Sequence, residues 1–157
     1  MLHKTHHVSV RGVVIEKGRI LVVKHAHSNR PPFWCFPGGR VEDDDETLAR
    51  ALQREMIEET GLKVEVGKVV YTQEFVQEKL LEFFFLCKIK SGKAKLGKDP
   101  DNPGIPILVD ISWASPEELL SMPVFPRTLA RKISTGEMQQ INHQVLYTKE
   151  EISNPTD

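Results

Sequence analysis

The sequence predicts a single domain of the mixed α/β (α+β) class. Three observations support this prediction: short β-rich runs dominate, turn residues separate them, and one long segment without glycine or proline has the composition of a helix. The chain has 157 residues, of which 39% are hydrophobic and 27% charged, so it can bury one substantial core. We find no repeat or linker and expect one domain over residues 1–157, with its core at about residues 8–135.

The predicted strands are short runs rich in β-branched and aromatic residues, with turn residues at their ends. They cover Val8–Ile15, Ile20–His25, Phe33–Phe36, Val64–Gln77, Leu80–Lys90 and Ile107–Trp113. A turn with Gly18 and a second turn near Gln77–Lys79 predict two hairpins. The segment 91–106 is rich in glycine, proline and lysine and predicts a surface loop, and Gln144–Thr148 is a candidate last strand.

The predicted helices have recognisable starts and stops. The segment Glu46–Thr60 contains only helix-compatible residues, and Gly61 is a typical stop. Ser115 is a candidate cap for a second helix, since proline follows it at the first helical position. The last predicted helix, Phe125–Thr135, ends before Gly136.

The first helix has an apolar stripe formed by Leu48, Ala51 and Leu52, which should face the core. At about 100° per residue, Glu55 and Glu59 fall within roughly 20° of the direction of Leu48. These two carboxylates therefore point inward rather than into solvent.

Glu58 lies at the edge of the same stripe, and the polar outer face carries Glu46, Arg50 and Arg54, with a favourable pair between Glu46 and Arg50. Crowded carboxylates at a buried position repel one another and have raised pKa values unless cations lie among them. Ligands that are all oxygen favour Mg²⁺, Mn²⁺ or Ca²⁺ over zinc. The alternative is a structural cluster that Arg54 or lysines neutralise.

The segment Arg54–Leu62 reads REMIEETGL, Glu46 lies eight positions before Arg54, and Trp34-x-x-Pro37-Gly38-Gly39 precedes both. This pattern resembles the box of the Nudix hydrolase family, G-x5-E-x7-R-E-U-x-E-E-x-G-U, where U is a bulky apolar residue. Six residues rather than five separate Gly39 from Glu46, and Asp45 replaces the usual small residue. We expect this extra residue to alter the loop before the helix, not the register of the glutamates.

The resemblance implies a Nudix-type α/β/α sandwich with a mixed central β-sheet and a loop–helix–loop. It implies an enzyme that uses Mg²⁺ or Mn²⁺ to hydrolyse a diphosphate bond in a nucleoside diphosphate linked to another moiety. The implied metal ligands are Glu55, Glu58, Glu59 and the backbone carbonyl of Gly38. Glu55 or Glu58 would also orient the attacking water as a catalytic residue, and the supporting residues would be Gly39, Glu46 and Arg54.

Members of the family often recruit a further acidic ligand from outside the box. The candidates are Asp99, Asp101, Asp110, Glu117 and Glu118. Candidate contacts for the outer phosphates are Arg11, Lys24, Arg30 and Arg40. The tags of the ADP-sugar, dinucleoside polyphosphate and coenzyme A subfamilies are absent, which favours a small MutT-like enzyme acting on a nucleoside triphosphate or a nucleotide sugar.

Two alternative functions stay open: a catalytically silent nucleotide-sensing module that kept the fold, and an RNA-cap or RNA-end hydrolase. The lysine-rich stretch Lys88–Lys98 is the local candidate for RNA, but a net charge of −1 argues against a nucleic-acid partner. We expect a small-molecule nucleotide as the partner. Whether the chain forms a homodimer stays open.

Several features have ordinary structural explanations. Cys35 and Cys87 show no metal-binding spacing and are expected to be buried, reduced thiols, which with the lack of a signal sequence predicts a cytoplasmic protein. No apolar run is long enough to span a membrane. The N-terminal histidines His3, His6 and His7 are expected to be solvated. Alternation should place Phe84 on one face of its strand and Phe83 and Phe85 on the other, as core residues.

Overall fold

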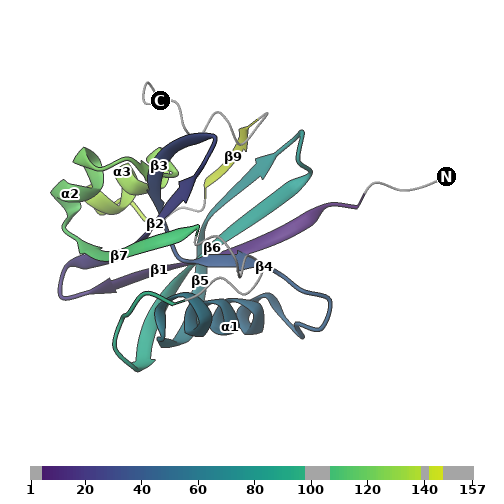
Figure 1. Cartoon of the computed structure of the whole chain (residues 1–157), viewed down its shortest axis with the longest axis horizontal. Helices are drawn as coiled ribbons and strands as arrows, with labels where there is room; N and C mark the ends of the chain where they lie inside the picture. Colours follow the sequence, from purple (N-terminus) through teal and green to yellow (C-terminus); the bar gives the residue numbers. More distant parts are fainter. Residues whose placement is uncertain (1–4, 98–106, 139–141, 147–157) are drawn as a thin grey trace.

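The computed structural model describes residues 5–97, 107–138 and 142–146. Its strands are β1 His7–Glu16, β2 Arg19–His27, β3 Arg30–Cys35, β4 Gly38–Arg40, β5 Lys63–Phe75, β6 Leu80–Ser91, β7 Leu108–Ala114, β8 Val124–Phe125 and β9 Asn142–Leu146. They form one curled sheet in the order β8-β3-β2-β1-β6-β5-β9, with β4 paired to β1 and β7 paired to β2 (Figure 1). Strand pairs β1–β6, β3–β8 and β5–β9 are parallel and the other pairs antiparallel, so the sheet is mixed.

Helices lie on both sides of this sheet. Helix α1, Leu48–Thr60, covers one side, and α2, Pro116–Ser121, and α3, Arg127–Thr135, lie on the other (Figure 1). Alternation along β1 explains the two layers: Val14 packs in the cluster with Leu52 of α1, whereas Val13 packs in the cluster with Leu129 of α3. The predicted α/β/α sandwich with a mixed central sheet is confirmed.

The predicted strands are all present, with shifted ends. Strand β3 begins at Arg30, three residues before the predicted start at Phe33. Its first part contains Pro31 and Pro32, and the pairing of β2 with β3 is irregular there, between His25 and His27. Strands β4 and β8 were not predicted, because each is too short to show an apolar pattern. The triple-phenylalanine prediction is confirmed: Phe83 and Phe85 pack on the α1 side and Phe84 on the opposite side.

The helix stops are confirmed, but two helix starts differ from the prediction. Gly61 and Gly136 have φ values of 72° and 76° and end α1 and α3 in the left-handed conformation that glycine favours. Helix α1 starts at Leu48, not Glu46, because the Thr47 hydroxyl caps it and accepts the Arg50 amide at 3.1 Å. The expected pair between Glu46 and Arg50 therefore does not form. Helix α3 starts at Arg127, since Val124–Phe125 pairs with β3 first.

Several smaller predictions also have outcomes. The cap of α2 is confirmed: Ser115 and Glu118 form a reciprocal capping box. Both cysteines are free and buried. His6 and His7 are exposed, and His3 lies outside the described residues. Among the helices of the described ranges, none has the length and apolar character needed to cross a membrane.

Candidate active site

Three glutamates lie in the C-terminal half of helix α1, and two of them point into the protein, as the sequence predicts. Glu55 and Glu59 are each 7% exposed, and Glu58 is partly exposed at the edge. Leu52 and Met56 lie on the same side of the helix and are fully buried against the sheet. The carboxylates are therefore held in place by the packing of the helix on which they lie.

The glycines of β4 lie directly against these carboxylates. The amide of Gly38 donates to Glu59 Oε2 at 3.0 Å. A Cβ atom at Gly39 would lie 2.5 Å from the Glu55 carboxylate, so only glycine leaves room for that group. The pairing of β4 with Ser9–Arg11 of β1 holds both glycines in this position.

Arg54 lies within the acidic cluster rather than on the outer face of α1. Its guanidinium contacts Glu55 at 3.0 Å and Glu58 at 3.3 Å. It also forms two hydrogen bonds with Asp45, of 3.0 Å from Nε and 2.8 Å from Nη2. Asp45, which replaces the usual small residue of the box, thus braces the loop against the helix.

Glu46 was expected to share this bracing role, but it is exposed and makes no ion pair with any described residue. A turn accounts for the difference: the Asp45 amide donates to the Glu42 carbonyl at 3.0 Å, and the Glu42 amide donates to Asp45 Oδ2 at 2.8 Å. This turn directs Asp45, not Glu46, toward Arg54.

The electrostatics of Glu55 differ from those of an ordinary surface carboxylate. Its pKa is raised to about 7, chiefly by burial, which the Arg54 guanidinium opposes and the Glu58 carboxylate reinforces. Oε1 of Glu55 accepts from Arg54, whereas Oε2 has no hydrogen-bond partner among the described residues. A buried carboxylate of this kind is stabilised in its charged form by an added cation.

The cluster matches a hard divalent cation in donor type, since it offers carboxylate and carbonyl oxygens. The side chains are at present held by the protein: Arg54 contacts Glu55 and Glu58, and the Gly38 amide contacts Glu59. Within the described ranges, no three histidine, cysteine or acidic side chains converge to form a metal site. Binding of a cation would require these carboxylates to exchange their present partners.

The segment that follows β6 covers the end of α1. The amide of Gly97 donates to the Glu59 carbonyl at 2.8 Å, and the amide of Lys95 donates to the Thr60 carbonyl at 3.0 Å. These contacts satisfy carbonyls that the helix end leaves free. Part of the lysine-rich stretch therefore supports the acidic helix.

The candidates for a further acidic ligand have different positions. Asp99 and Asp101 lie outside the described residues. Asp110 is exposed on β7, where its Oδ1 accepts the Ile111 amide at 2.8 Å. Glu117 is exposed in the first turn of α2, and Glu118 takes part in the capping box. None of these last three contacts the acidic cluster through a hydrogen bond or ion pair in the described part of the chain.

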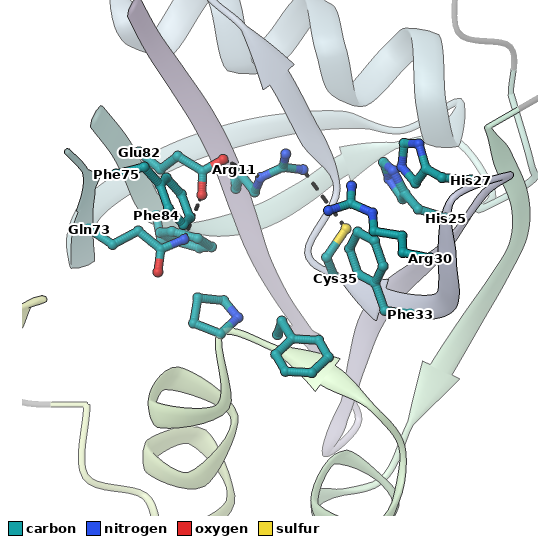
Figure 2. Close-up of a pocket in the computed structure, with 12 residues that line it drawn as sticks. Arg11, His25, His27, Arg30, Phe33, Cys35, Gln73, Phe75, Glu82 and Phe84 are labelled. Carbon is teal, nitrogen blue, oxygen red and sulfur yellow. Dashed lines mark hydrogen bonds and ion pairs between the residues drawn. The ribbon is translucent and has the colours of Figure 1, made fainter. Parts of the chain in front are cut away.

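A cavity of about 180 Å³ lies on the side of the sheet opposite α1 (Figure 2). One wall comes from β1, β5 and β6, where Arg11, Gln73 and Glu82 form a buried polar network. Arg11 Nε donates to Glu82 Oε1 at 3.3 Å, and Gln73 Nε2 donates to Glu82 Oε2 at 2.6 Å. Burial lowers the pKa of the Arg11 guanidinium, but the charges of Glu82, Cys35 and Glu59 outweigh this effect and raise it overall.

The opposite wall of the cavity is aromatic. The Phe33 ring stacks with those of His25 and His27, with centroids 5.6 Å and 6.1 Å apart, and the Arg30 guanidinium lies 4.7 Å from the Phe33 centroid. Burial lowers the pKa of His25 to about 3, so this ring is neutral at pH 7. Flat rings beside donors and acceptors can hold a planar polar ligand.

The cavity and the acidic cluster are joined by the short segment between β3 and β4. Arg11 Nη1 donates to the Phe36 carbonyl at 3.0 Å, and two residues later the Gly38 amide binds Glu59. Of the candidate phosphate contacts, Arg11 and Arg30 line the cavity. Lys24 lies 5.8 Å from the Trp34 centroid, and Arg40 is exposed.

Reasoning from the sequence did not identify this cavity. Its signal was present in two strands. Gln73 is two positions from Tyr71 and from Phe75, and Glu82 is two positions from Phe84. Each polar residue therefore lies on the same, inward face of its strand as these aromatic residues. A polar residue at such a position usually has a partner or a function.

The curled mixed sheet, the acidic helix and the glycine strand before it define a Nudix-type domain. Comparison with known proteins agrees: the model of the NUDIX domain matches residues 5–133. The chain belongs to the Nudix hydrolase family and is a hydrolase.

Three similar proteins illustrate the range of the family. A MutT-like protein of Streptomyces ambofaciens is 32% identical over 115 residues, which cover 73% of this chain and 67% of that protein. The CTP pyrophosphohydrolase of Escherichia coli (strain K12) is 29% identical over 121 residues, covering 76% of this chain and 84% of that protein. The crystal structure of a NUDIX hydrolase from Nitrosomonas europaea has a TM-score of 0.75 at 17% identity, covers 94% of this chain and 82% of that chain, and supports the fold alone.

Proposed function

We propose that this hydrolase cleaves a diphosphate bond in a nucleoside diphosphate linked to another moiety, with Mg²⁺ or Mn²⁺ as its cofactor. A nucleoside triphosphate or a nucleotide sugar is the proposed substrate. The main supporting observation is an imbalance of charge in the acidic cluster. The Arg54 guanidinium alone contacts four carboxylates, those of Glu42, Asp45, Glu55 and Glu58. A purely structural cluster would need more cations than Arg54 supplies.

In this proposal the cofactor is held by the carboxylates of Glu55, Glu58 and Glu59 and by the carbonyl of Gly38. When bound, such an ion neutralises phosphate oxygens and lowers the pKa of a coordinated water. Glu55 would accept a proton from the attacking water at Oε2, since its Oε1 already accepts from Arg54. Arg54 keeps the Glu55 side chain oriented through Oε1.

The cavity supports a nucleotide as the substrate. The rings of Phe33, His25 and His27 offer a surface for a base, and Arg30 makes no ion pair with any described residue, so its charge is available to phosphate. The segment Phe36–Gly38 leads from the cavity to the carboxylates. The CTP pyrophosphohydrolase among the similar proteins is consistent with this class of substrate.

The proposal is tested by phosphate release from a panel of nucleoside triphosphates and nucleotide sugars, with Mg²⁺ or Mn²⁺. The variants are Glu55→Gln, Glu58→Gln and Glu59→Gln, and Glu65→Gln is the matched control because Glu65 is exposed on β5. We expect turnover of at least one compound, and losses of about 100-fold or more in the three box variants, but not in the control. Equal activity in all four variants would exclude the proposed roles.

The nucleotide-sensing alternative gives a different result in the same panel. Such a module would bind nucleotides in calorimetry without releasing phosphate with either metal. The box variants would then change binding but could not change turnover. Calorimetric titration of Mn²⁺ without nucleotide adds an independent readout, in which Glu58→Gln and Glu59→Gln should weaken binding and Glu65→Gln should not.

A further inference from the structure

The cavity wall holds a buried glutamine whose amide has only one of its two ends paired. Gln73 is 2% exposed, and its Nε2 donates to Glu82 Oε2 at 2.6 Å. Because the nitrogen carries the donors and a carboxylate accepts, this bond fixes the orientation of the amide. Oε1 of Gln73 is turned away from Glu82 (Figure 2), is buried and has no hydrogen-bond partner among the described residues, and the Gln73 side chain lines the cavity.

The network around Gln73 keeps this oxygen in place. Gln73 and Glu82 are directly opposite each other on β5 and β6. The other carboxylate oxygen of Glu82, Oε1, accepts a hydrogen bond from Arg11. Arg11 is held in turn by the Phe36 carbonyl. A buried acceptor that is rigidly held and unpaired is unusual in a folded protein, and it points to a donor that a ligand supplies.

The surroundings of Oε1 indicate which donor fits. Gln73 Oε1 and the Glu82 carboxylate place acceptors next to each other on this wall, and the nearby donors of Arg11 are partly used. An exocyclic amino group offers two N–H donors on one nitrogen. The pairing edge of uracil or thymine instead offers one N–H between two carbonyl oxygens, which would face these acceptors. The wall therefore favours an amino group over a carbonyl.

We propose that Gln73 is a specificity-determining residue that selects nucleotides whose base carries an exocyclic amino group, which donates to Gln73 Oε1. This inference rests on the proposed function, because it assumes that the cavity takes the base of the substrate. The selected class comprises cytosine, adenine and guanine nucleotides. On the opposite wall, the side chain of His25 also has a buried nitrogen, Nε2, without a hydrogen-bond partner in the described part of the chain.

The test compares nucleotides that differ by the amino group alone. The pairs are GTP with ITP, ATP with purine riboside triphosphate, and CTP with its 4-deamino analogue. For each pair, the ratio of kcat/KM is measured in the wild type, in Gln73→Met, which keeps the length of the side chain without its acceptor, and in Gln77→Met. Gln77 is the matched control because it is exposed in the turn between β5 and β6.

In the wild type we expect the amino-bearing member of at least one pair to be preferred about tenfold or more, the value of one well-made hydrogen bond. The ratio should fall to near one in Gln73→Met and stay unchanged in Gln77→Met. A ratio that is the same in the wild type and in Gln73→Met would overturn the inference. An equal loss for both members of each pair would also overturn it, because it would show a structural role; thermal unfolding identifies that case.

Failure of the proposed function gives a separate result. If the wild type turns over none of the six nucleotides, their equilibrium binding is measured by calorimetry in EDTA with the same three proteins. A preference for the amino-bearing member that Gln73→Met removes would then support the role of Gln73 in a protein that binds without hydrolysis. Binding that is equal within each pair would overturn the inference.

Discussion

Asp45, rather than Glu46, should be the residue that holds the loop before α1 against Arg54. The change that tests this is Asp45→Asn, which keeps the shape of the side chain and removes its charge. It replaces one of the two oxygens that accept from Arg54, at 3.0 Å and 2.8 Å, with an amide nitrogen that faces the guanidinium. The matched controls are Glu46→Gln and Asp44→Asn, since both residues are exposed neighbours in the same loop.

The expected cost follows from the burial and geometry of the pair. The Asp45 side chain is 8% exposed and that of Arg54 is 25% exposed, so the interaction is only partly screened by solvent. Hydrogen bonds to charged groups contribute about 1.5–3 kcal/mol each, and Arg54 would keep its contacts with Glu55 and Glu58. We therefore expect Asp45→Asn to lower the free energy of unfolding by about 2 kcal/mol. Each control should change it by less than about 0.5 kcal/mol, as is usual for exposed positions.

The assay is urea unfolding in EDTA, followed by tryptophan fluorescence. A double-mutant cycle with Arg54→Gln isolates the pair, and its coupling energy should be about 1 kcal/mol or more. If Glu46→Gln cost as much as Asp45→Asn, the bracing role would belong to Glu46, as the family pattern implies. If the coupling energy were near zero, the contact would have no energetic role.

Three further predictions concern the surroundings of the acidic cluster and the cavity. Gly39→Ala should lower kcat/KM by about 100-fold with little change in melting temperature, because a Cβ only 2.5 Å from the Glu55 carboxylate forces that group to move. Gly97→Ala should lower the free energy of unfolding by about 1–3 kcal/mol in urea, because its Cβ would lie 1.8 Å from the Glu58 carbonyl oxygen. Burial lowers the pKa of His25 from 6.5 to about 3. Below pH 6.5 the unfolded chain therefore binds a proton at His25 that the folded protein does not bind, and the free energy of unfolding falls as the pH falls. Between pH 7 and pH 5 the wild type should lose about 2 kcal/mol more than His25→Gln in urea unfolding; equal losses would contradict the buried, neutral state of this ring.

The sequence was sufficient for features that depend on local periodicity. The inward direction of Glu55 and Glu59 follows from their angular position relative to Leu48, and burial of both is confirmed. The ends of α1 and α3 follow from the backbone freedom of Gly61 and Gly136. Each of these depends on residues within a few positions of one another.

The sequence was insufficient where partners are far apart along the chain. Arg11 and Glu82 are separated by 71 positions, and only the parallel pairing of β1 with β6 brings them together. The predicted position of Arg54, on the polar outer face of the helix, was wrong for a related reason. A helical wheel gives the direction of the Cβ atom, whereas the long side chain of Arg54 reaches Asp45 in the preceding loop. Asp45 itself could not be separated from Glu46, because the turn at residues 42–45 decides which of them faces the helix.

The short segment between β3 and β4 explains why the cavity and the acidic helix should act on one ligand. Its Phe36 carbonyl accepts from Arg11, which belongs to the cavity network, and its Gly38 amide donates to Glu59 of the acidic cluster. The Pro37 carbonyl between them accepts the Gly12 amide at 2.8 Å, so β1 fixes the segment in the middle. This rigidity favours a substrate that spans both places, because the distance between the base wall and the carboxylates is then set by the fold before the ligand arrives.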